Sequence, residues 1–380
     1  MKKLIIVLFS LAFLAAAITL GVKQNTQHKD NDFSANPVDL LKTESSPDHF
    51  SRAIHPRKFI FPDDNGPHNG FQTEWWYYTG NLSAPDGRRF GYQFTLFRRA
   101  MTASSGDKEP PASTWRTRHV FIGHLAVTDV DKDTFYHFER FSREGAGLAG
   151  ATSKPYRVWL ENWVVREETD AVRITAVENG LSLELILSPE KPHVLNGKDG
   201  LSQKGPGVGN ASYYFSQTRL ATTGKITVND DNFSVKGFSW LDREWSTSAL
   251  GPEQTGWDWF ALQLNDGRDI MLYQIRDKDN RGDEYSSGTI ILPDGGSQPL
   301  GPEDFVIDIL DEWRSRETGV EYPIKWKLAI KPLGLELVVT PLIKDQEHTN
   351  RLVYWEGAVK VDSDHAGGYG YVELVGYGES

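Results

Sequence analysis

Cysteine is absent from this sequence of 380 residues, and its absence excludes several kinds of chemistry. Without a thiol there is no cysteine nucleophile, no disulfide bond, no cysteine-bound zinc and no lipid on an N-terminal cysteine. The His-Glu-x-x-His zinc motif, the P-loop and the dinucleotide-binding glycine pattern are missing as well. We therefore expect neither a metal nor an organic cofactor.

Motifs of nucleophilic catalysis are also scarce. The stretch GFSWL at 237–241 lacks the final glycine of the Gly-x-Ser-x-Gly elbow found in α/β-hydrolases. A Ser-His-Asp triad scattered along the chain stays open, although no pattern points to one. His119 and His124 are five residues apart, which places them on opposite faces of an extended strand. They are therefore not expected to share a metal ion.

Long apolar runs are confined to the N-terminus, where Lys2 and Lys3 precede an uncharged stretch at 4–22. Its length lies between that of a signal peptide's apolar region and that of a membrane-spanning helix. We expect residues 1–22 to be either a signal peptide or an N-terminal membrane anchor. Either alternative exports the remainder to the periplasm or the extracellular space. Residues 23–52 are polar and are expected to form a flexible linker.

Positive charge is in deficit, because 41 Lys and Arg stand against 52 Asp and Glu, for a net charge of −11. Such acidity disfavours nucleic acid and anionic membrane surfaces as partners. Aromatic residues are abundant instead, with 12 Trp, 14 Tyr and 19 Phe. Aromatic rings favour strands and line apolar pockets, so we expect a hydrophobic small molecule or lipid as ligand.

Two parts of the sequence resemble each other. Three pairs of segments match in the same order: 75–98 with 258–276, 180–192 with 334–345, and 237–245 with 368–377. The first pair shares an Asp-Gly-Arg turn that is typical of a tight hairpin. Ordered matches of this kind indicate a duplicated all-β module. We therefore expect an N-terminal β domain at 53–248 and a C-terminal β domain at 249–380.

Acidic residues occur inside aromatic-rich strands. The segments are EWWYY at 74–78, WLDREW at 240–245, WDWF at 257–260 and YWE at 354–356. Residues i and i+2 share a face of a strand, so Trp240, Asp242 and Glu244 are expected to lie together. The expected ligand-binding residues are Glu74, Trp76, Tyr78, Trp240, Trp245, Trp257 and Trp259.

Asp242 and Glu244 are our candidate proton donors. Burial among rings raises the pKa of a carboxyl group and keeps it protonated, and aromatic faces stabilise a developing carbocation. This combination suits protonation of an alkene. The alternative is structural, because a buried acid often pairs with arginine. We interpret Glu74, Glu356 and Glu373 as structural, whereas both roles stay open for Asp242 and Glu244.

The Trp-rich blocks resemble those of the AttH-like family of secreted proteins, which is related to bacterial carotenoid hydratases. The matching blocks are FQTEWWYYTG at 71–80, WLDREWS at 240–246, GWDWFA at 256–261, YWEG at 354–357 and GYVEL at 370–374. The resemblance implies two tandem lipocalin-like β-barrels. It also implies hydration of a carbon–carbon double bond without a cofactor in some relatives, a hydrolase label in others, and an ABC-type envelope transporter as partner. Where the hydratase branch carries a histidine, this chain has Arg243, while Trp245 matches.

The sequence thus favours an exported two-barrel protein that binds a long apolar ligand, isoprenoid- or lipid-like, as a carrier or envelope lipophile-handling factor. The alternative is a cofactor-independent, acid-catalysed hydratase or isomerase acting on an alkene or polyene. A secreted ester hydrolase is less favoured. The two main alternatives make different structural predictions. Carriage leaves the pocket acids paired with arginine, whereas catalysis leaves one acid unpaired and facing the cavity.

Overall fold

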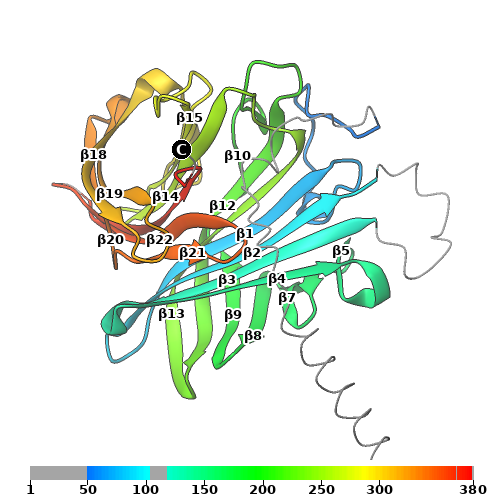
Figure 1. Ribbon diagram of the computed structural model, residues 1–380, viewed down its shortest axis with the longest axis vertical. Helices are drawn as coiled ribbons and strands as arrows, with labels where there is room; N and C mark the ends of the chain where they lie inside the picture. Colours follow the sequence, from blue (N-terminus) through cyan, green and yellow to red (C-terminus); the bar gives the residue numbers. More distant parts are fainter. Residues whose placement is uncertain (1–48, 103–117, 365, 379–380) are drawn as a thin grey trace, which may run out of the picture. The chain divides into compact units, whose positions relative to one another are not determined.

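The strand-rich character of the sequence is realised in the computed structural model, which describes residues 49–102, 118–364 and 366–378. These residues form two antiparallel β-sheets within one compact unit (Figure 1). The helical segments of this part are short 3-10 turns: η1 (Asp63–Asn65), η2 (Val130–Lys132), η3 (Gly145–Gly147), η4 (Pro302–Asp304) and η5 (Lys331–Leu333). Across the described ranges, no helix has the length and apolar character needed to cross a membrane.

The first sheet contains 13 strands in the order β4-β3-β2-β1-β13-β12-β9-β8-β7-β6-β5, with β10 and β11 also paired to β12. Its strands are β1 (Thr73–Ser83), β2 (Arg89–Ala100), β3 (His119–Asp129), β4 (Thr134–Arg143), β5 (Ala149–Ser153), β6 (Tyr156–Leu160), β7 (Trp163–Glu168), β8 (Ala171–Glu178), β9 (Leu181–Pro189), β10 (Val194–Leu195), β11 (Leu201–Gln203), β12 (Ala211–Val228) and β13 (Asp231–Ser248).

The second sheet contains 10 strands in the order β17-β16-β15-β14-β23-β22-β20-β19-β18, with β21 also paired to β22. It is drawn yellow to red in Figure 1, where it curls round toward closure. Its strands are β14 (Gln254–Leu264), β15 (Asp269–Asp277), β16 (Ser287–Ile291), β17 (Ser297–Leu300), β18 (Phe305–Arg314), β19 (Glu321–Ile330), β20 (Leu335–Pro341), β21 (Glu347–Thr349), β22 (Val353–Asp362) and β23 (Gly368–Val375).

The two sheets share one strand order, as the internal repeat predicts. The run β4-β3-β2-β1-β13-β12-β9-β8 corresponds to β17-β16-β15-β14-β23-β22-β20-β19. The matched hairpins turn at Gly87 and Gly267, whose φ angles of 93° and 88° lie in the left-handed region that favours glycine. The predicted fold class, two related lipocalin-like β domains, is confirmed. The chain passes from one sheet to the other between Ser248 and Gln254.

Strand β1 positions the site because its two faces meet different surroundings. Trp76 and Tyr78 point into the apolar core of the first sheet and are fully buried there. Trp75 and Tyr77 point the opposite way and meet residues of the second sheet, which has its own apolar core. Burial of each large side chain contributes roughly 1.5–3 kcal/mol, so both faces of the strand favour the folded state.

The expected leader at 1–22 and most of the expected linker lie outside the described residues. The end of the linker, however, packs against the first sheet. Phe50 is buried, and the Ser51 backbone N–H donates a hydrogen bond to the Gly70 carbonyl over 2.8 Å. Thr247 on β13 donates a side-chain hydrogen bond to the Ser51 carbonyl over 2.5 Å. The first folded domain therefore begins a few residues before the predicted boundary at 53.

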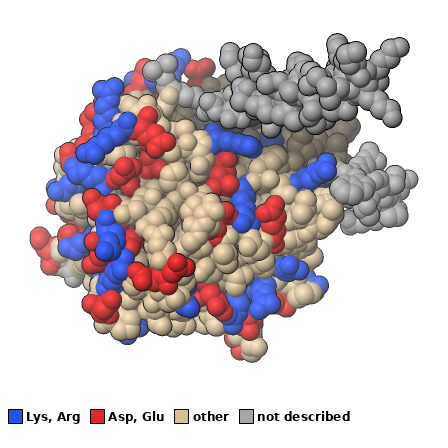
Figure 2. Space-filling view, turned by 60° about the horizontal axis from the view of Figure 1, so that its bottom comes forward, with Lys and Arg blue, Asp and Glu red and all other residues tan. Residues whose placement is uncertain are grey.

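Charged side chains of both signs are interspersed on the face seen in Figure 2. Tan areas lie between them, and blue and red side chains adjoin one another in several places. Positive and negative groups side by side partly cancel each other's field at a distance. This face therefore presents a mixed surface rather than a stripe of one sign.

Candidate active site

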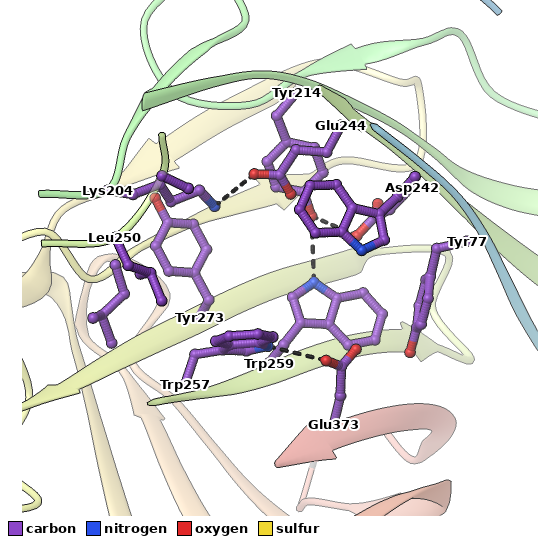
Figure 3. A pocket seen from close by; sticks show the side chains of 13 residues that line it. Tyr77, Lys204, Tyr214, Asp242, Glu244, Leu250, Trp257, Trp259, Tyr273 and Glu373 are labelled. Carbon is purple, nitrogen blue, oxygen red and sulfur yellow. Dashed lines mark hydrogen bonds and ion pairs between the residues drawn. The ribbon is translucent and has the colours of Figure 1, made fainter. Parts of the chain in front are cut away.

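A cavity lies between β1, β12 and β13 of the first sheet and β14, β15 and β23 of the second (Figure 3). Its first lobe has about 730 Å³ of space, the open mouth included. A second lobe of about 580 Å³ adjoins it between β1, β2, β3, β22 and β23. The lobes share the side chains of Trp75, Tyr77, Trp257 and Glu373. The shared walls are mainly aromatic, as is common in sites for small organic ligands.

Asp242 borders the first lobe from β13, directly opposite Tyr77 on β1 and Ser216 on β12. Its Oδ1 atom accepts hydrogen bonds from the Ser216 hydroxyl (2.5 Å) and from Nε1 of Trp240 (2.7 Å). Its Oδ2 atom accepts one from the Tyr214 hydroxyl (2.5 Å). In the described part of the chain, no lysine or arginine forms an ion pair with this carboxyl.

The surroundings of Asp242 determine its protonation. Burial raises the pKa of Asp242 from 3.8 to about 6, and the nearby Glu244 carboxyl adds to the rise. The hydrogen bonds from Ser216, Tyr214 and Trp240 lower the pKa, but by less than burial raises it. A carboxyl with this pKa exchanges protons close to neutral pH, which general acid–base catalysis requires.

Glu244 lies two residues further along the same face of β13 and has different partners. It accepts a hydrogen bond from the Ser212 hydroxyl (2.5 Å), and its Oε1 atom is 3.4 Å from Nζ of Lys204. The Lys204 ammonium also lies 3.7 Å from the centre of the Tyr273 ring. Glu244 is thus the charge-paired acid of the first lobe, whereas Asp242 is the unpaired one.

Glu373 borders both lobes from β23, and Glu356 faces it from the adjacent strand β22. Nε1 of Trp257 donates a hydrogen bond to Glu373 over 3.1 Å. Burial raises the pKa of Glu373 to about 7, with a contribution from Asp242 and Glu244. Burial and the Glu373 carboxyl raise the pKa of Glu356 well above its usual range. Two carboxyls facing each other without a cation therefore retain a proton near neutral pH.

Aromatic side chains separate the acids and form the walls of the cavity. Figure 3 shows Trp259 between Asp242 and Glu373, with Tyr77 beside it. The rings of Tyr77 and Trp259 meet edge to face, with centroids 5.1 Å apart. Nε1 of Trp259 is 3.3 Å from the Tyr214 hydroxyl. The first lobe therefore combines ring faces with carboxyl groups that enter it from both sheets.

The structure brings only some of the predicted site residues into the cavity. Asp242, Glu244, Trp257 and Trp259 line the first lobe, and Trp240 supports Asp242 by the hydrogen bond described above. The prediction that Trp76 and Tyr78 bind ligand is corrected, because both lie in the core of the first sheet. Their neighbours Trp75 and Tyr77 line the cavity instead, since alternate residues of a strand point to opposite faces.

Glu74 and Trp245 also lie away from the cavity, in a buried cluster on the other face of β13. Glu74 accepts hydrogen bonds from Nε of Arg98 (3.0 Å) and from Nη2 of Arg243 (2.7 Å). Trp245 stacks on His68, whose Nδ1 atom is 2.8 Å from Glu74. The expectation that Glu74 and Trp245 contact ligand is thus corrected, whereas the structural interpretation of Glu74 fits its two arginine partners.

Arg243, the position at which the resemblance implies a histidine in the hydratase branch, belongs to the same buried cluster. Its guanidinium group also donates to the backbone carbonyls of Asn65 and Gly66. This side chain points away from Asp242 because the two residues are adjacent on a strand. The residue at position 243 therefore does not contact the acids of the cavity.

Sequence reasoning missed several residues of the site. Glu356 and Glu373 were recognised as acids among aromatic residues but were interpreted as structural. Lys204 lies in a polar segment before β12, and nothing in its local pattern signals a cavity. Tyr214 carried a weak signal, since the repeat pairs Tyr213 and Tyr214 with Tyr354 and Trp355. Across the described ranges, no group of three or more His, Asp or Glu is arranged to hold a metal ion.

Comparisons with known proteins place this geometry in context. A sequence model of the AttH-like family matches residues 52–377. The solved structure of an AttH protein from Nitrosomonas europaea is 35% identical, with a TM-score of 0.77, and the match covers 86% of this chain and 100% of that one.

Two further similarities concern an enzyme. Kievitone hydratase of Fusarium solani subsp. phaseoli is 23% identical over 289 residues, which cover 72% of this chain and 80% of that protein. The crystal structure of kievitone hydratase from Nectria haematococca has the same fold, with a TM-score of 0.64 and 16% identity. That match covers 87% of this chain and 97% of the other.

Proposed function

This chain belongs to the AttH-like family, and we propose that it adds water across a carbon–carbon double bond of an apolar ligand held in the cavity. The observation that carries the proposal is that Asp242 and Glu373, neither of which forms an ion pair with a described lysine or arginine, approach the same space from the two sheets. The hydratase similarity described above supports the same chemistry. The carrier function that the sequence favoured is therefore the second choice.

Hydration of an alkene needs a proton donor, a surface that stabilises a cation, and a base for the attacking water. Glu373 and its partner Glu356 retain a proton near neutral pH and supply the donor. Asp242 has the lower pKa, so near neutral pH it is ionised more often than Glu373 and is available as the base. Two acids whose surroundings separate their pKa values are suited to these complementary roles.

The proposed hydration needs no cofactor, because each bond that breaks is matched by one that forms. The proton of the Glu373 carboxyl adds to one alkene carbon, and the π electrons form the new C–H bond, which leaves a cation on the other carbon. The faces of Trp259 and Tyr77 stabilise this cation by roughly 0.5–2 kcal/mol each. Water then forms the C–O bond and gives its proton to Asp242. The product is an alcohol, and the reverse sequence dehydrates it.

The lining of the first lobe indicates the kind of substrate. The walls near Asp242 are aromatic, whereas Lys204 and Glu244 form a polar end. An isoprenoid-like alkene with a hydroxyl, phenol or carboxyl at its other end matches both parts. The alkene lies among the rings, and the polar group reaches the lysine and the glutamate.

Export, an ABC-type envelope transporter as partner, and tethering by residues 4–22 remain parts of the proposal that rest on the sequence alone. A fusion of residues 1–50 to a reporter that is active only outside the cytoplasm tests export. A silent reporter beside normal expression contradicts it.

Incubation in heavy-oxygen water tests the proposed reaction. The probes are an acyclic polyene, a terpenoid alkene with a terminal hydroxyl, and kievitone. We expect the purified protein to form a labelled alcohol from at least one probe, as measured by mass spectrometry. Binding of these probes without label incorporation favours the carrier function instead. A labelled product from an ester probe favours the hydrolase alternative.

A further inference from the structure

A chain of polar side chains leads from the acid pair toward the protein surface. The Tyr354 hydroxyl lies 2.6 Å from Nδ1 of His124, which lines the second lobe from β3. Nε2 of His124 is 3.4 Å from Oε2 of Glu139 on β4. Glu139 in turn lies 3.9 Å from Nε of Arg351, whose side chain is 64% exposed. The Glu139 side chain is itself 9% exposed, so the chain meets solvent at Glu139.

The inner end of this chain meets the acid pair. Tyr354 also interacts with the Glu356 carboxyl, which Tyr77 binds through Oε1. Oε2 of Glu356 is buried and has no hydrogen bond to another described group, so it is available to accept a proton. Glu373 faces Glu356 across the adjacent strand. Tyr354 thus adjoins the acid pair at the inner end of the chain.

The surroundings of the chain keep competing charges away. His348 stacks on Tyr354 with ring centroids 4.6 Å apart, and His124 is 5.6 Å from His348. Burial lowers the pKa of His348 well below its usual value, with further lowering from His124 and His137. Burial also lowers the pKa of His137. These two histidines are therefore neutral near pH 7 and act as packing around the chain.

We propose that Glu139, His124 and Tyr354 form a proton relay that reloads the Glu356–Glu373 pair from solvent between turnovers. The proposal rests on the proposed hydratase function, because only a reaction that consumes the proton of the pair needs it replaced. It assigns roles to three residues that do not touch the reacting carbons. The relay crosses from the first sheet, which holds β3 and β4, to the second sheet, which holds β22.

The relay balances protons at every step. Glu139 takes a proton from solvent and passes it to Nε2 of His124. The proton on Nδ1 of His124 moves to the Tyr354 oxygen as the Tyr354 hydroxyl proton moves to Glu356. Each bond that breaks is matched by one that forms. Glu356 then passes a proton to Glu373, which faces it on β23, and Asp242 releases the proton that it took from water to solvent when the product leaves. The pair can therefore be recharged while the product still fills the first lobe.

Glu139→Gln tests the outer end of the relay, because Glu139 does not line either lobe. We expect the first turnover to proceed at the wild-type rate, since the pair is already protonated. Steady-state turnover should fall by about 10- to 100-fold. Glu144→Gln is the matched control, since Glu144 pairs with His119 at the start of β3 over 3.2 Å, and it should leave both rates unchanged. Equal steady-state rates, or an equal loss in the first turnover, would overturn the relay.

His124→Ala provides a second test through chemical rescue. We expect its steady-state rate to be low and to rise when imidazole is added. Pyrazole has a ring of the same size but is a far weaker base, so it should not restore the rate. Rescue by neither compound, or by both equally, contradicts proton transfer through His124. A loss of folding in this variant would leave Glu139→Gln as the deciding measurement.

Infrared spectroscopy separates failure of the relay from failure of the hydratase function. The C=O stretch of a buried protonated carboxyl shifts in heavy water as its proton exchanges. We expect this exchange to be about tenfold slower in Glu139→Gln than in the wild type or Glu144→Gln, with no substrate present. Unchanged exchange overturns the relay. A wild type that exchanges through the relay but hydrates no probe overturns the hydratase function alone.

Discussion

The two faces of strand β13 hold buried acids in opposite electrostatic settings. On one face Arg243 and Arg98 surround Glu74, and all three side chains are almost completely buried. On the other face Asp242 is buried to a similar extent but has only neutral hydrogen-bond donors. Burial by itself raises the pKa of both carboxyls. The arginines reverse that effect at Glu74 and hold its pKa well below 4.5.

This contrast shows that burial alone does not mark an acid as functional. Glu74 is a permanent anion that joins β1, β2 and β13 into one charged cluster, so its role is to hold the strands together. Asp242 and Glu373 lack such partners and exchange protons near neutral pH, at a cost in stability. A strand can thus carry a structural acid contact on one face and a reactive acid on the other.

The largest expected effect is the loss of activity in Asp242→Asn. Asparagine retains the shape and an acceptor for Ser216 and Trp240, but it cannot take a proton from water. Hydration should fall by about 10²–10⁴-fold, while ligand binding persists. Glu373→Gln should show a loss of the same order. Turnover by label incorporation and binding by tryptophan fluorescence check both, and full activity in either variant would remove that residue from the mechanism.

The next largest effect concerns the face of β13 that carries the cluster of Glu74, Arg98 and Arg243. Glu74→Gln leaves two buried guanidinium groups without a countercharge, which should cost about 3–5 kcal/mol in the free energy of unfolding. Urea denaturation measures this loss. Glu336→Gln removes an acid from an exposed pair with Lys327 and should barely change stability. A Glu74→Gln protein as stable as the wild type would show that this cluster is dispensable.

The free energy of unfolding should depend on pH in opposite directions for Asp242 and Glu74, the acids on the two faces. The raised pKa of Asp242 means that the wild type loses stability as pH rises from about 4 through 6, since a buried charge then forms. Asp242→Asn should therefore gain on the wild type between pH 4 and pH 8 by up to about 3 kcal/mol. The contribution of Glu74 to stability changes in the opposite direction. Because its pKa is lowered, this contribution disappears as pH falls below 4.5. A difference in the free energy of unfolding between Asp242→Asn and the wild type that does not change with pH would contradict this account.

The smallest effect is the pH dependence of catalysis. Activity should rise through about pH 6 as Asp242 loses its proton and should fall through about pH 7 as Glu373 loses its own. Each limb should change the rate by about tenfold per pH unit. Measurement of kcat/KM between pH 4.5 and 8.5 checks this profile. A flat profile across that range would exclude these carboxyls as the acid and base.

The sequence by itself determined the class of fold and the duplication. Alternating strands, matched Asp-Gly turns and three ordered repeats follow from local chemistry, because a glycine at positive φ and a period of two are visible in the chain. The Trp-rich blocks likewise identified the family, and Asp242 was singled out because aromatic residues surround it in the sequence. These features depend on neighbours within a few residues.

Only the tertiary structure decided which face of each strand meets the cavity. A shift of one residue exchanges the faces, so Trp75 and Tyr77 took the places expected for Trp76 and Tyr78. Long-range pairing also decided the charge of each acid, since Arg243 reaches Glu74 across 169 residues. Glu356 and Glu373 could not be identified as facing acids because the strand register between β22 and β23 sets them opposite each other. A carboxyl acquires its pKa from groups that fold around it, and those groups are distant in the sequence.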